Sequence, residues 1–407
     1  MKILQLTNKL PYPAKDGGAL AIRAIAEGLA ACGHEVVILA MNTKKHYVPS
    51  ENIPVPPYAS ISLIPVDVPA DTSPFSALSN LLFSNQPYNL IRFISSNYKD
   101  ELSKLLDNHN FDVAIFEGLY VTPYLPVFDS YPGILKVYRA HNIESEIWNR
   151  LAGNAFGFLR QFYFRNLAAR IEEIEDGLMN RYDALLPITD RDAATFAQKG
   201  NKMPVLVVPA GIPAKNLPLM PQLMDKLDFF HLGALDWAPN QEGILWFLEQ
   251  VWLKHLEVHA DSTFHLAGRN APSWLVHKLN KVPGLVYHGE VESASEFMAA
   301  HHLMVVPLLS GSGMRVKIAE GMMAGKCVLA TSIGLEGIPA VHGEQVLVAE
   351  SAQDFLFWMN EVIENQRISE TIGRQAAEFA VNQFDAIQLA ANLSGFLHNL
   401  LRTKSSE

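Results

Sequence analysis

Short apolar runs alternate with longer amphipathic segments along the first half of the chain. Apolar runs over 2–6, 35–41 and 112–117 predict buried strands, and the segment 19–32 has the periodicity of a helix that ends at Gly33. Further strands are expected over 61–68, 134–140 and 184–189. Strands that alternate with helices in this way predict βαβ units and a parallel sheet.

The same alternation begins again after residue 200. A length of 407 residues exceeds what one compact core normally supports, so two domains are expected. The predicted fold class is α/β, with two doubly wound, Rossmann-like domains that face an interdomain cleft. Strands are expected over 203–208, 229–233, 263–267, 286–287, 303–306, 326–331 and 345–348, and helices over 352–363, 369–383 and 386–401 close the chain.

The long helical segment 156–182 carries aromatic and aliphatic residues around much of its circumference. Three arginines, Arg160, Arg165 and Arg170, are interleaved with them. We interpret the segment as a core helix that packs on the sheet while its arginines extend to solvent. The alternative is a helix that lies on a membrane surface.

The composition is that of an ordinary globular protein, with 49% hydrophobic and 18% charged residues. A formal net charge of −10 argues against a nucleic-acid partner bound by bulk electrostatics. No apolar stretch approaches the roughly 20 residues of a spanning helix, and the N-terminus predicts a strand rather than a signal peptide. We therefore expect a cytoplasmic protein, with peripheral contact to the inner membrane face as an option.

The segment 310–321, of sequence SGSGMRVKIAEG, is the strongest chemical signal. It joins the expected strand 303–306 to a helical pattern, so a Gly/Ser loop leads into a helix N-terminus. Free N–H groups and the helix dipole favour a phosphate there, and Arg315 and Lys317 add two positive charges. Glu320 follows about one turn later and could accept hydrogen bonds from a ribose. These parts suit a diphosphate next to a sugar; the alternative is a tight turn beside a solvated helix face.

Other candidate residues follow expected strands, at the sheet edge where ligands bind in open parallel sheets. Gly17 and Gly18 would let the backbone approach a phosphate or sugar, unless they are plain turn glycines. His141 could hydrogen-bond a sugar or an acceptor; the alternative is a structural histidine. Gly268 ends a strand of the second domain and could contact the base or phosphate. The histidines show no metal-ligand spacing along the chain, so no metal is expected.

In the order and spacing of its motifs, the chain resembles the retaining glycosyltransferases of family 4, also called group 1, which have the GT-B fold. The similarity extends over nearly the whole length. Each motif is weak alone, whereas their combination is specific. The motifs are PYP (11–13) with DGG (16–18), LAACGHEV (29–36), AHNIE (140–144), VPAGI (208–212), and the segments 311–317, 320–325 and 331–337.

The resemblance implies an N-terminal acceptor domain, 1–200, completed by a returning C-terminal helix, 386–402. It implies a C-terminal domain, 201–385, that binds a UDP- or GDP-sugar, with a glycan or lipid-linked acceptor and no cofactor. The implied site consists of His141, Arg315 and Lys317 for catalysis, and of Gly17, Gly18, Gly268, Gly311, Ser312, Gly313 and Glu320 for donor binding.

Two positions depart from the family pattern. Many members carry paired glutamates eight residues apart; Glu320 is the second of them, but Ser312 stands where the first would fall. Many also carry an Arg and a Lys after the first strand of the second domain, where this chain has DWAPN at 236–240. Arg315 and Lys317 would then carry the diphosphate charge. Because position 312 has no carboxylate, we favour a front-face reaction in which the leaving phosphate deprotonates the acceptor.

The sequence thus predicts a retaining hexosyltransferase of cell-surface polysaccharide synthesis. The alternative is a non-catalytic partner subunit of the same fold that binds a nucleotide-sugar. A nucleotide-sugar epimerase fits less well, because the acids and histidine that it needs around the sugar are not apparent. A dinucleotide dehydrogenase would need a G-x-G-x-x-G motif after Leu6, which is absent.

Overall fold

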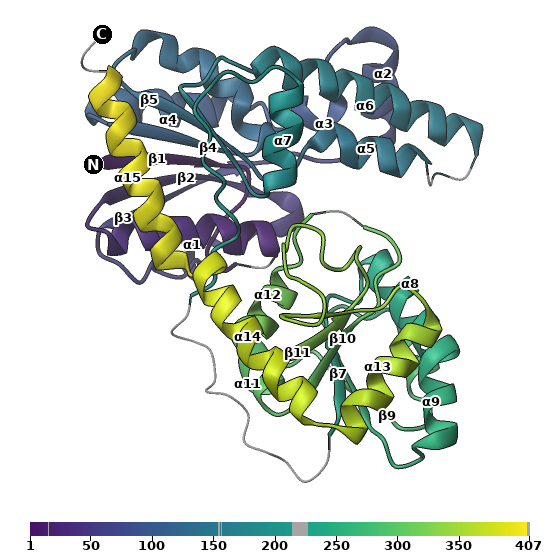
Figure 1. Cartoon of the computed structure of the whole chain (residues 1–407). Helices are drawn as coiled ribbons and strands as arrows, with labels where there is room; N and C mark the ends of the chain where they lie inside the picture. Colours follow the sequence, from purple (N-terminus) through teal and green to yellow (C-terminus); the bar gives the residue numbers. More distant parts are fainter. Residues whose placement is uncertain (15, 154, 156, 214–226, 312, 405–407) are drawn as a thin grey trace. The chain divides into compact units, whose positions relative to one another are not determined.

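A computed structural model describes residues 1–14, 16–153, 155, 157–213, 227–311 and 313–404. The chain forms two compact α/β units (Figure 1). Unit 1 consists of Met1–Gly211 and Ala386–Glu407, and unit 2 consists of Ile212–Asp385. The sequence placed these boundaries after residues 200 and 385.

Unit 1 is built on a six-stranded parallel sheet of order β3-β2-β1-β4-β5-β6. Its strands are β1 (Lys2–Thr7), β2 (Glu35–Thr43), β3 (Ile61–Val68), β4 (Val113–Glu117), β5 (Leu135–Ala140) and β6 (Ala184–Pro187). Its helices are α1 (Gly17–Ala31), α2 (Pro74–Phe83), α3 (Tyr88–Ile91), α4 (Ser96–Asn108), η3 (Leu119–Ser130), α5 (Glu144–Gly153), α6 (Phe158–Leu178), α7 (Asp190–Gln198) and α15 (Ala386–Lys404).

Both faces of this sheet are buried, as the continuous apolar runs of its central strands require. One face packs on α1 and α15, through side chains such as Ile25 and Leu393. The other packs on α4, η3 and the C-terminal part of α6, through side chains such as Leu102 and Phe128. The C-terminal helix α15 therefore completes the core of unit 1, where it lies against α1 (Figure 1).

Unit 2 repeats this architecture with a second parallel sheet, of order β12-β11-β10-β7-β8-β9. Its strands are β7 (Phe229–Leu232), β8 (Phe264–Ala267), β9 (Leu285–Gly289), β10 (Leu303–Val306), β11 (Cys327–Ala330) and β12 (Leu347–Val348). Its helices are α8 (Ala238–Phe247), η5 (Leu248–Trp252), α9 (Leu253–Val258), α10 (Ser273–Leu279), α11 (Ala294–Ala299), α12 (Val316–Met323), α13 (Ala352–Glu364) and α14 (Arg367–Phe384).

Two expectations about secondary structure need correction. The predicted strand 203–208 is not a strand: it forms an isolated bridge from Val205 to Leu185, and the ladder goes no further because Pro187, which accepts from Val208, has no N–H to donate. The interpretation of 156–182 as a core helix holds for its second half, where Leu167 and Ile171 are buried. It is wrong for the start of α6, where Phe158 and Leu159 are about four-fifths exposed (79% and 81%). Among the described helices, none is long and apolar enough to cross a membrane.

The contact between α1 and α15 depends on the absence of a side chain at Gly28. A Cβ atom there would lie 2.5 Å from the Cβ of Ala390 and 2.7 Å from the carbonyl oxygen of Ala386. The substitution Gly28→Ala should therefore destabilise the protein by about 1–3 kcal/mol through overpacking, which urea denaturation would measure.

The matched control is Gly177→Ala in α6, where a Cβ atom would meet nothing within 4 Å. Removing a helical glycine without a clash should stabilise the protein by up to about 1 kcal/mol. Equal unfolding midpoints for the Gly28→Ala variant and the wild type would contradict the close packing of α15.

Candidate functional site

A buried ion pair lies at the carboxyl edge of the sheet in unit 1. Glu117 ends β4 and pairs in register with Arg139 on β5, so the two side chains share one face of the sheet. Arg139 donates from Nη1 to Oε2 of Glu117 over 3.1 Å, and both side chains have no solvent exposure. Gln5 on β1 donates to the other carboxylate oxygen over 2.6 Å. Arg139 also donates to the carbonyl oxygen of Ala21, which joins the pair to α1.

His141 is bound to this ion pair. Its Nε2 atom lies 2.5 Å from Oε2 of Glu117, and its side chain retains 15% exposure. Burial lowers the pKa of His141, against the opposing effect of Glu117, so the ring is neutral at pH 7. Burial alone would raise the pKa of Glu117, but Arg139 and His141 outweigh it and lower that pKa to about 2. The ionised carboxylate accepts the Nε2–H of His141, which leaves Nδ1 as a hydrogen-bond acceptor.

The predicted Gly17-Gly18 loop forms the first turn of α1. Asp16 caps this helix by accepting the N–H of Ala19 over 2.8 Å, and Lys9 pairs with the Asp16 carboxylate at 3.1 Å. A Cβ atom on Gly18 would lie 3.2 Å from the Nζ atom of Lys9. The N-terminus of α1 thus already holds a carboxylate, and Lys9 is a cation beside Gly18 that the sequence interpretation did not single out.

In unit 2, the loop after β10 carries Arg315 against an aromatic ring. The guanidinium of Arg315 lies 5.1 Å from the ring of Trp237, which follows β7. Arg315 also donates to the carbonyl oxygen of Gly313. Gly311 has a φ of 125°, and a Cβ atom there would lie 2.6 Å from Nη2 of Arg315 and 2.9 Å from Cη2 of Trp237. Glycine at 311 is therefore required both by the backbone and by the Arg–Trp contact.

Arg315 immediately precedes α12, and Lys317 and Glu320 lie within that helix. Lys317 donates from Nζ to Oε2 of Glu320 over 2.5 Å, with side-chain exposures of 39% and 17%. The start of α12 thus carries two cations, and an acid follows about one turn later, which is the arrangement expected from the spacing of these residues in the sequence. Ser312 lies outside the described residues. The roles of these residues in donor binding remain predictions.

Gly268 has a packing reason for its identity. A Cβ atom at this position would lie 2.0 Å from the carbonyl oxygen of Gly233 and 2.7 Å from Cγ of Leu235. The close approach of the loops after β7 and β8 is sufficient to require glycine at 268. Its predicted contact with a nucleotide is therefore not needed to explain it.

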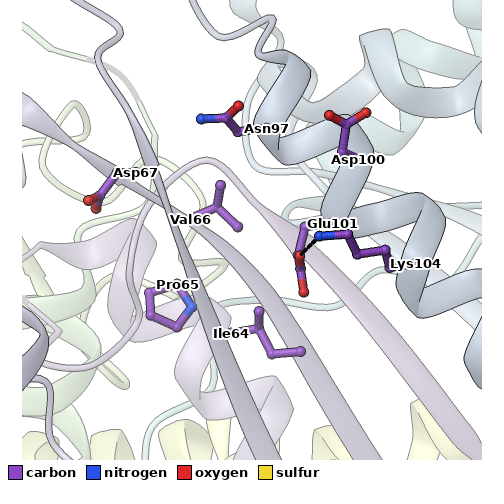
Figure 2. A pocket seen from close by; sticks show the side chains of 8 residues that line it. All are labelled: Ile64, Pro65, Val66, Asp67, Asn97, Asp100, Glu101 and Lys104. Atoms are coloured by element: carbon purple, nitrogen blue, oxygen red, sulfur yellow. Dashed lines mark hydrogen bonds and ion pairs between the residues drawn. The ribbon is translucent and has the colours of Figure 1, made fainter.

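A surface pocket of about 480 Å³ lies elsewhere in unit 1, between the edge strand β3 and α4 (Figure 2). Figure 2 shows that Lys104 is paired with Glu101 in its wall, at 3.2 Å. With Asp67 and Asp100 also in the lining, acids outnumber the cation and the pocket is unsuited to a diphosphate. It is lined by Ile64, Pro65, Val66, Asp67, Asn97, Asp100, Glu101 and Lys104, and by none of the predicted site residues.

A comparison with protein families finds a match within unit 2, the unit that carries Arg315 and Lys317. The family of glycosyl transferases group 1 matches residues 226–365, which lie within this unit. The match covers most of unit 2. A relative of similar length is an uncharacterized 44.6 kDa protein in the cps region of Klebsiella pneumoniae, 25% identical over 410 residues that cover 95% of each chain.

Several solved structures are similar in fold to nearly the whole chain, and not only to the residues that the family matches. Sucrose-phosphate synthase from Thermosynechococcus elongatus has a TM-score of 0.73 at 14% identity, over 99% of this chain and 100% of that chain. HepE of Anabaena in complex with UDP and glucose has a TM-score of 0.62 at 16% identity, over 98% and 100%. WaaG, a glycosyltransferase involved in lipopolysaccharide biosynthesis, has a TM-score of 0.62 at 18% identity, over 98% and 99%. The predicted GT-B fold is confirmed.

The Glu117 carboxylate should make stability depend on pH in the acid range. Its pKa rises from about 2 in the fold to an ordinary 4.5 on unfolding, so its contribution is present above pH 4.5 and is lost toward pH 2. The loss should reach roughly 3 kcal/mol by linkage. Glu117→Gln should flatten this dependence and lower stability at pH 7 by roughly 3–5 kcal/mol, because Arg139 stays buried without its partner.

Urea denaturation between pH 7 and pH 2 measures both effects. Glu101→Gln is the control, because that carboxylate pairs with Lys104 on the surface and should change stability by less than about 1 kcal/mol. If the Glu117→Gln variant kept the wild-type dependence on pH, the assignment of that dependence to the buried pair would be wrong.

Proposed function

We propose that the chain is a retaining hexosyltransferase, which moves a sugar from a UDP- or GDP-linked donor to a glycan or lipid-linked acceptor. The observation that carries this proposal is the pair of cations, Arg315 and Lys317, at the N-terminus of α12 within the residues that match the group 1 glycosyltransferase family. A leaving nucleotide diphosphate gains negative charge in the transition state, and fixed positive groups stabilise it. This chemistry needs neither a metal ion nor a cofactor.

Each predicted residue has a defined part in the proposed reaction. Arg315, held by Trp237, and Lys317 bind the diphosphate, and the N–H groups at the start of α12 add to them. Glu320 accepts from Lys317 through Oε2, so a ribose hydroxyl would bind at Oε1. In unit 1, His141 offers its Nδ1 atom to a hydroxyl of the transferred sugar. Gly17 and Gly18, beside Lys9, are the proposed backbone contact to the donor.

The relatives support the choice of donor and pathway class. HepE was solved with UDP and with UDP-glucose, which are the kind of ligand proposed here. The Klebsiella relative belongs to a cps region, in keeping with a role in cell-surface polysaccharide synthesis. With Ser312 where many members carry a glutamate, we favour a front-face reaction over a covalent intermediate. A cytoplasmic location, where nucleotide-sugars are available, is part of this proposal.

A surface of unit 1 suits peripheral contact with a membrane that carries a lipid-linked acceptor. Arg170 of α6 donates from Nη2 to the carbonyl oxygen of Leu81 over 3.0 Å, so α6 and α2 are neighbours. Both helices expose large apolar side chains, and α6 also carries arginines, the combination that enters a bilayer interface. The side chains of this apolar surface are Phe75, Leu78, Leu82, Phe83, Phe158, Leu159 and Phe162, each more than half exposed.

Removing either cation should abolish most transfer while the fold persists. Arg315→Ala and Lys317→Ala should each lower kcat by roughly 100-fold or more, the usual cost of losing one transition-state donor. Release of UDP or GDP from a panel of nucleotide-sugars measures the rate, and thermal unfolding checks the fold. Lys278→Ala, which removes a surface pair with Glu249 in the same unit, should keep full activity.

Three results would change the proposal. Full activity in Arg315→Ala and Lys317→Ala would remove its basis. A wild-type chain that binds UDP-sugars without transfer or hydrolysis would favour the alternative, a non-catalytic partner subunit. Inversion at the anomeric carbon, seen by NMR of the product, would exclude the retaining mechanism.

The apolar surface predicts binding to lipid vesicles. The double substitution Phe158→Ser and Leu159→Ser should weaken co-sedimentation with anionic vesicles at least tenfold, because two large apolar side chains no longer enter the interface. The control is Val258→Ser at the end of α9, which changes an equally exposed apolar residue of unit 2. Equal vesicle binding by wild type and the double variant would show that α6 is not a membrane contact.

A further inference from the structure

Four histidines and one aspartate gather around strands β7 to β10 of the sheet in unit 2. Asp228 immediately precedes β7, and His301 and His302 precede β10. His265 lies in β8 and His288 in β9. The strand order β10-β7-β8-β9 makes these positions neighbours, although they are spread over 75 residues of sequence. Asp228, His301 and His302 precede their strands, whereas Arg315 lies in the loop that follows β10.

Three of the histidines bring their ring nitrogens together. One ligand atom each from His265, His288 and His301 lies within 4.8 Å of the others. The closest pair is Nδ1 of His265 and Nε2 of His288, at 2.9 Å. Two neutral imidazoles at this distance share a single hydrogen, and a metal ion can take the place of that hydrogen.

Asp228 orients two of the three rings. Its Oδ2 atom lies 2.6 Å from Nδ1 of His301 and 3.5 Å from Nε2 of His265. Its Oδ1 atom accepts from the backbone N–H and from Nδ1 of His302, both over 2.8 Å. A carboxylate on the far nitrogen of a histidine fixes its tautomer and leaves the other nitrogen as a metal ligand. Nδ1 of His265 and Nε2 of His301 are therefore the atoms presented to an ion.

We infer that His265, His288 and His301 form a binding site for a divalent transition-metal ion of the Zn²⁺ type, with Asp228 as the supporting carboxylate. Imidazole sets of this kind suit Zn²⁺, Co²⁺, Ni²⁺ and Cu²⁺, rather than Mg²⁺ or Ca²⁺, which prefer oxygen. This site is independent of the proposed transfer reaction. It also revises the expectation of no metal for this chain, which was based on spacing along the sequence.

The surroundings of the cluster carry charges of both signs. The nearby cation is Lys326, whose Nζ donates to the carbonyl oxygen of His301 over 2.6 Å. Asp228 supplies a negative charge that is bonded directly to the ring of His301.

Closing the site requires the rings to reorient. Zn–N bonds of about 2.0–2.1 Å in a tetrahedral site place ligand nitrogens roughly 3.3 Å apart. The His265–His288 pair is already near that separation, whereas the wider distances in the cluster must shorten. His265 and His301 are stacked with their ring centroids 4.1 Å apart, so one of these two rings must turn before both can face one ion. An ion there would link β8, β9 and the segment before β10, so its expected role is to stabilise unit 2.

Metal binding tests this inference directly. The full chain, without a histidine tag and stripped with a chelator, is titrated with Zn²⁺ and separately with Co²⁺. We expect one ion per chain, the visible absorption of tetrahedral Co²⁺, and a Zn²⁺-dependent rise in Tm. His288→Ala should weaken Zn²⁺ binding at least 100-fold and remove the rise in Tm. Asp228→Asn should weaken it by about 10–100-fold.

His277→Ala is the matched control, because His277 is an exposed histidine of unit 2, on α10, outside the cluster. It should bind Zn²⁺ as the wild type does. Failure of the wild type to bind one equivalent of Zn²⁺, or equal affinity in His288→Ala and His277→Ala, would overturn the inference. Because His288 is exposed, loss of binding in its variant is separable from misfolding by the Tm measured without metal.

Discussion

The buried pair of Glu117 and Arg139 is the constraint on which the carboxyl edge of unit 1 depends. Two charges without solvent are costly unless each remaining hydrogen-bonding group is satisfied. Gln5, His141 and the carbonyl oxygen of Ala21 provide much of that satisfaction. The pair thereby fixes β1, β4, β5 and α1 relative to one another, and it holds His141 in one tautomer. This buried polar network therefore determines that His141 presents its Nδ1 atom at the carboxyl edge of the sheet.

Unit 2 uses a different means to position its charges. Arg315 is held by stacking on Trp237 and by a glycine that leaves room for both groups. This contact exists because β7 and β10 are adjacent, so the loops that follow them meet at the carboxyl edge. Many group 1 enzymes carry basic residues in the loop after the first strand of this domain, as the resemblance implies. Here that loop supplies the ring of Trp237, and Arg315 from the loop after β10 lies over this ring.

The sequence predicts the repeated architecture well because each strand and helix is a local pattern. It fails where the decisive contact is long-range. In the sequence, Trp237 appeared only as part of a loop without basic residues. Nothing in the adjacent sequence indicates that the guanidinium of Arg315 will lie over its ring. Glu117 was not singled out either, although an acid that ends a buried apolar strand needs a partner and could have been noticed. The first turn of α6 was misjudged because periodicity shows that a helix has an apolar face, but not whether the sheet extends far enough to cover it.

The histidine cluster illustrates the same limit elsewhere in the sheet of unit 2. Metal-ligand motifs are recognised in sequence when two ligands lie a few residues apart on one element. In a parallel sheet, however, residues of neighbouring strands meet whatever their separation along the chain, here 265, 288 and 301. Each βα repeat brings the chain back to both edges, so one fold offers two places where distant residues converge. The carboxyl edge of unit 2 carries the proposed donor site, and the inferred metal site lies among other residues of the same sheet, where its expected role is to stabilise the unit.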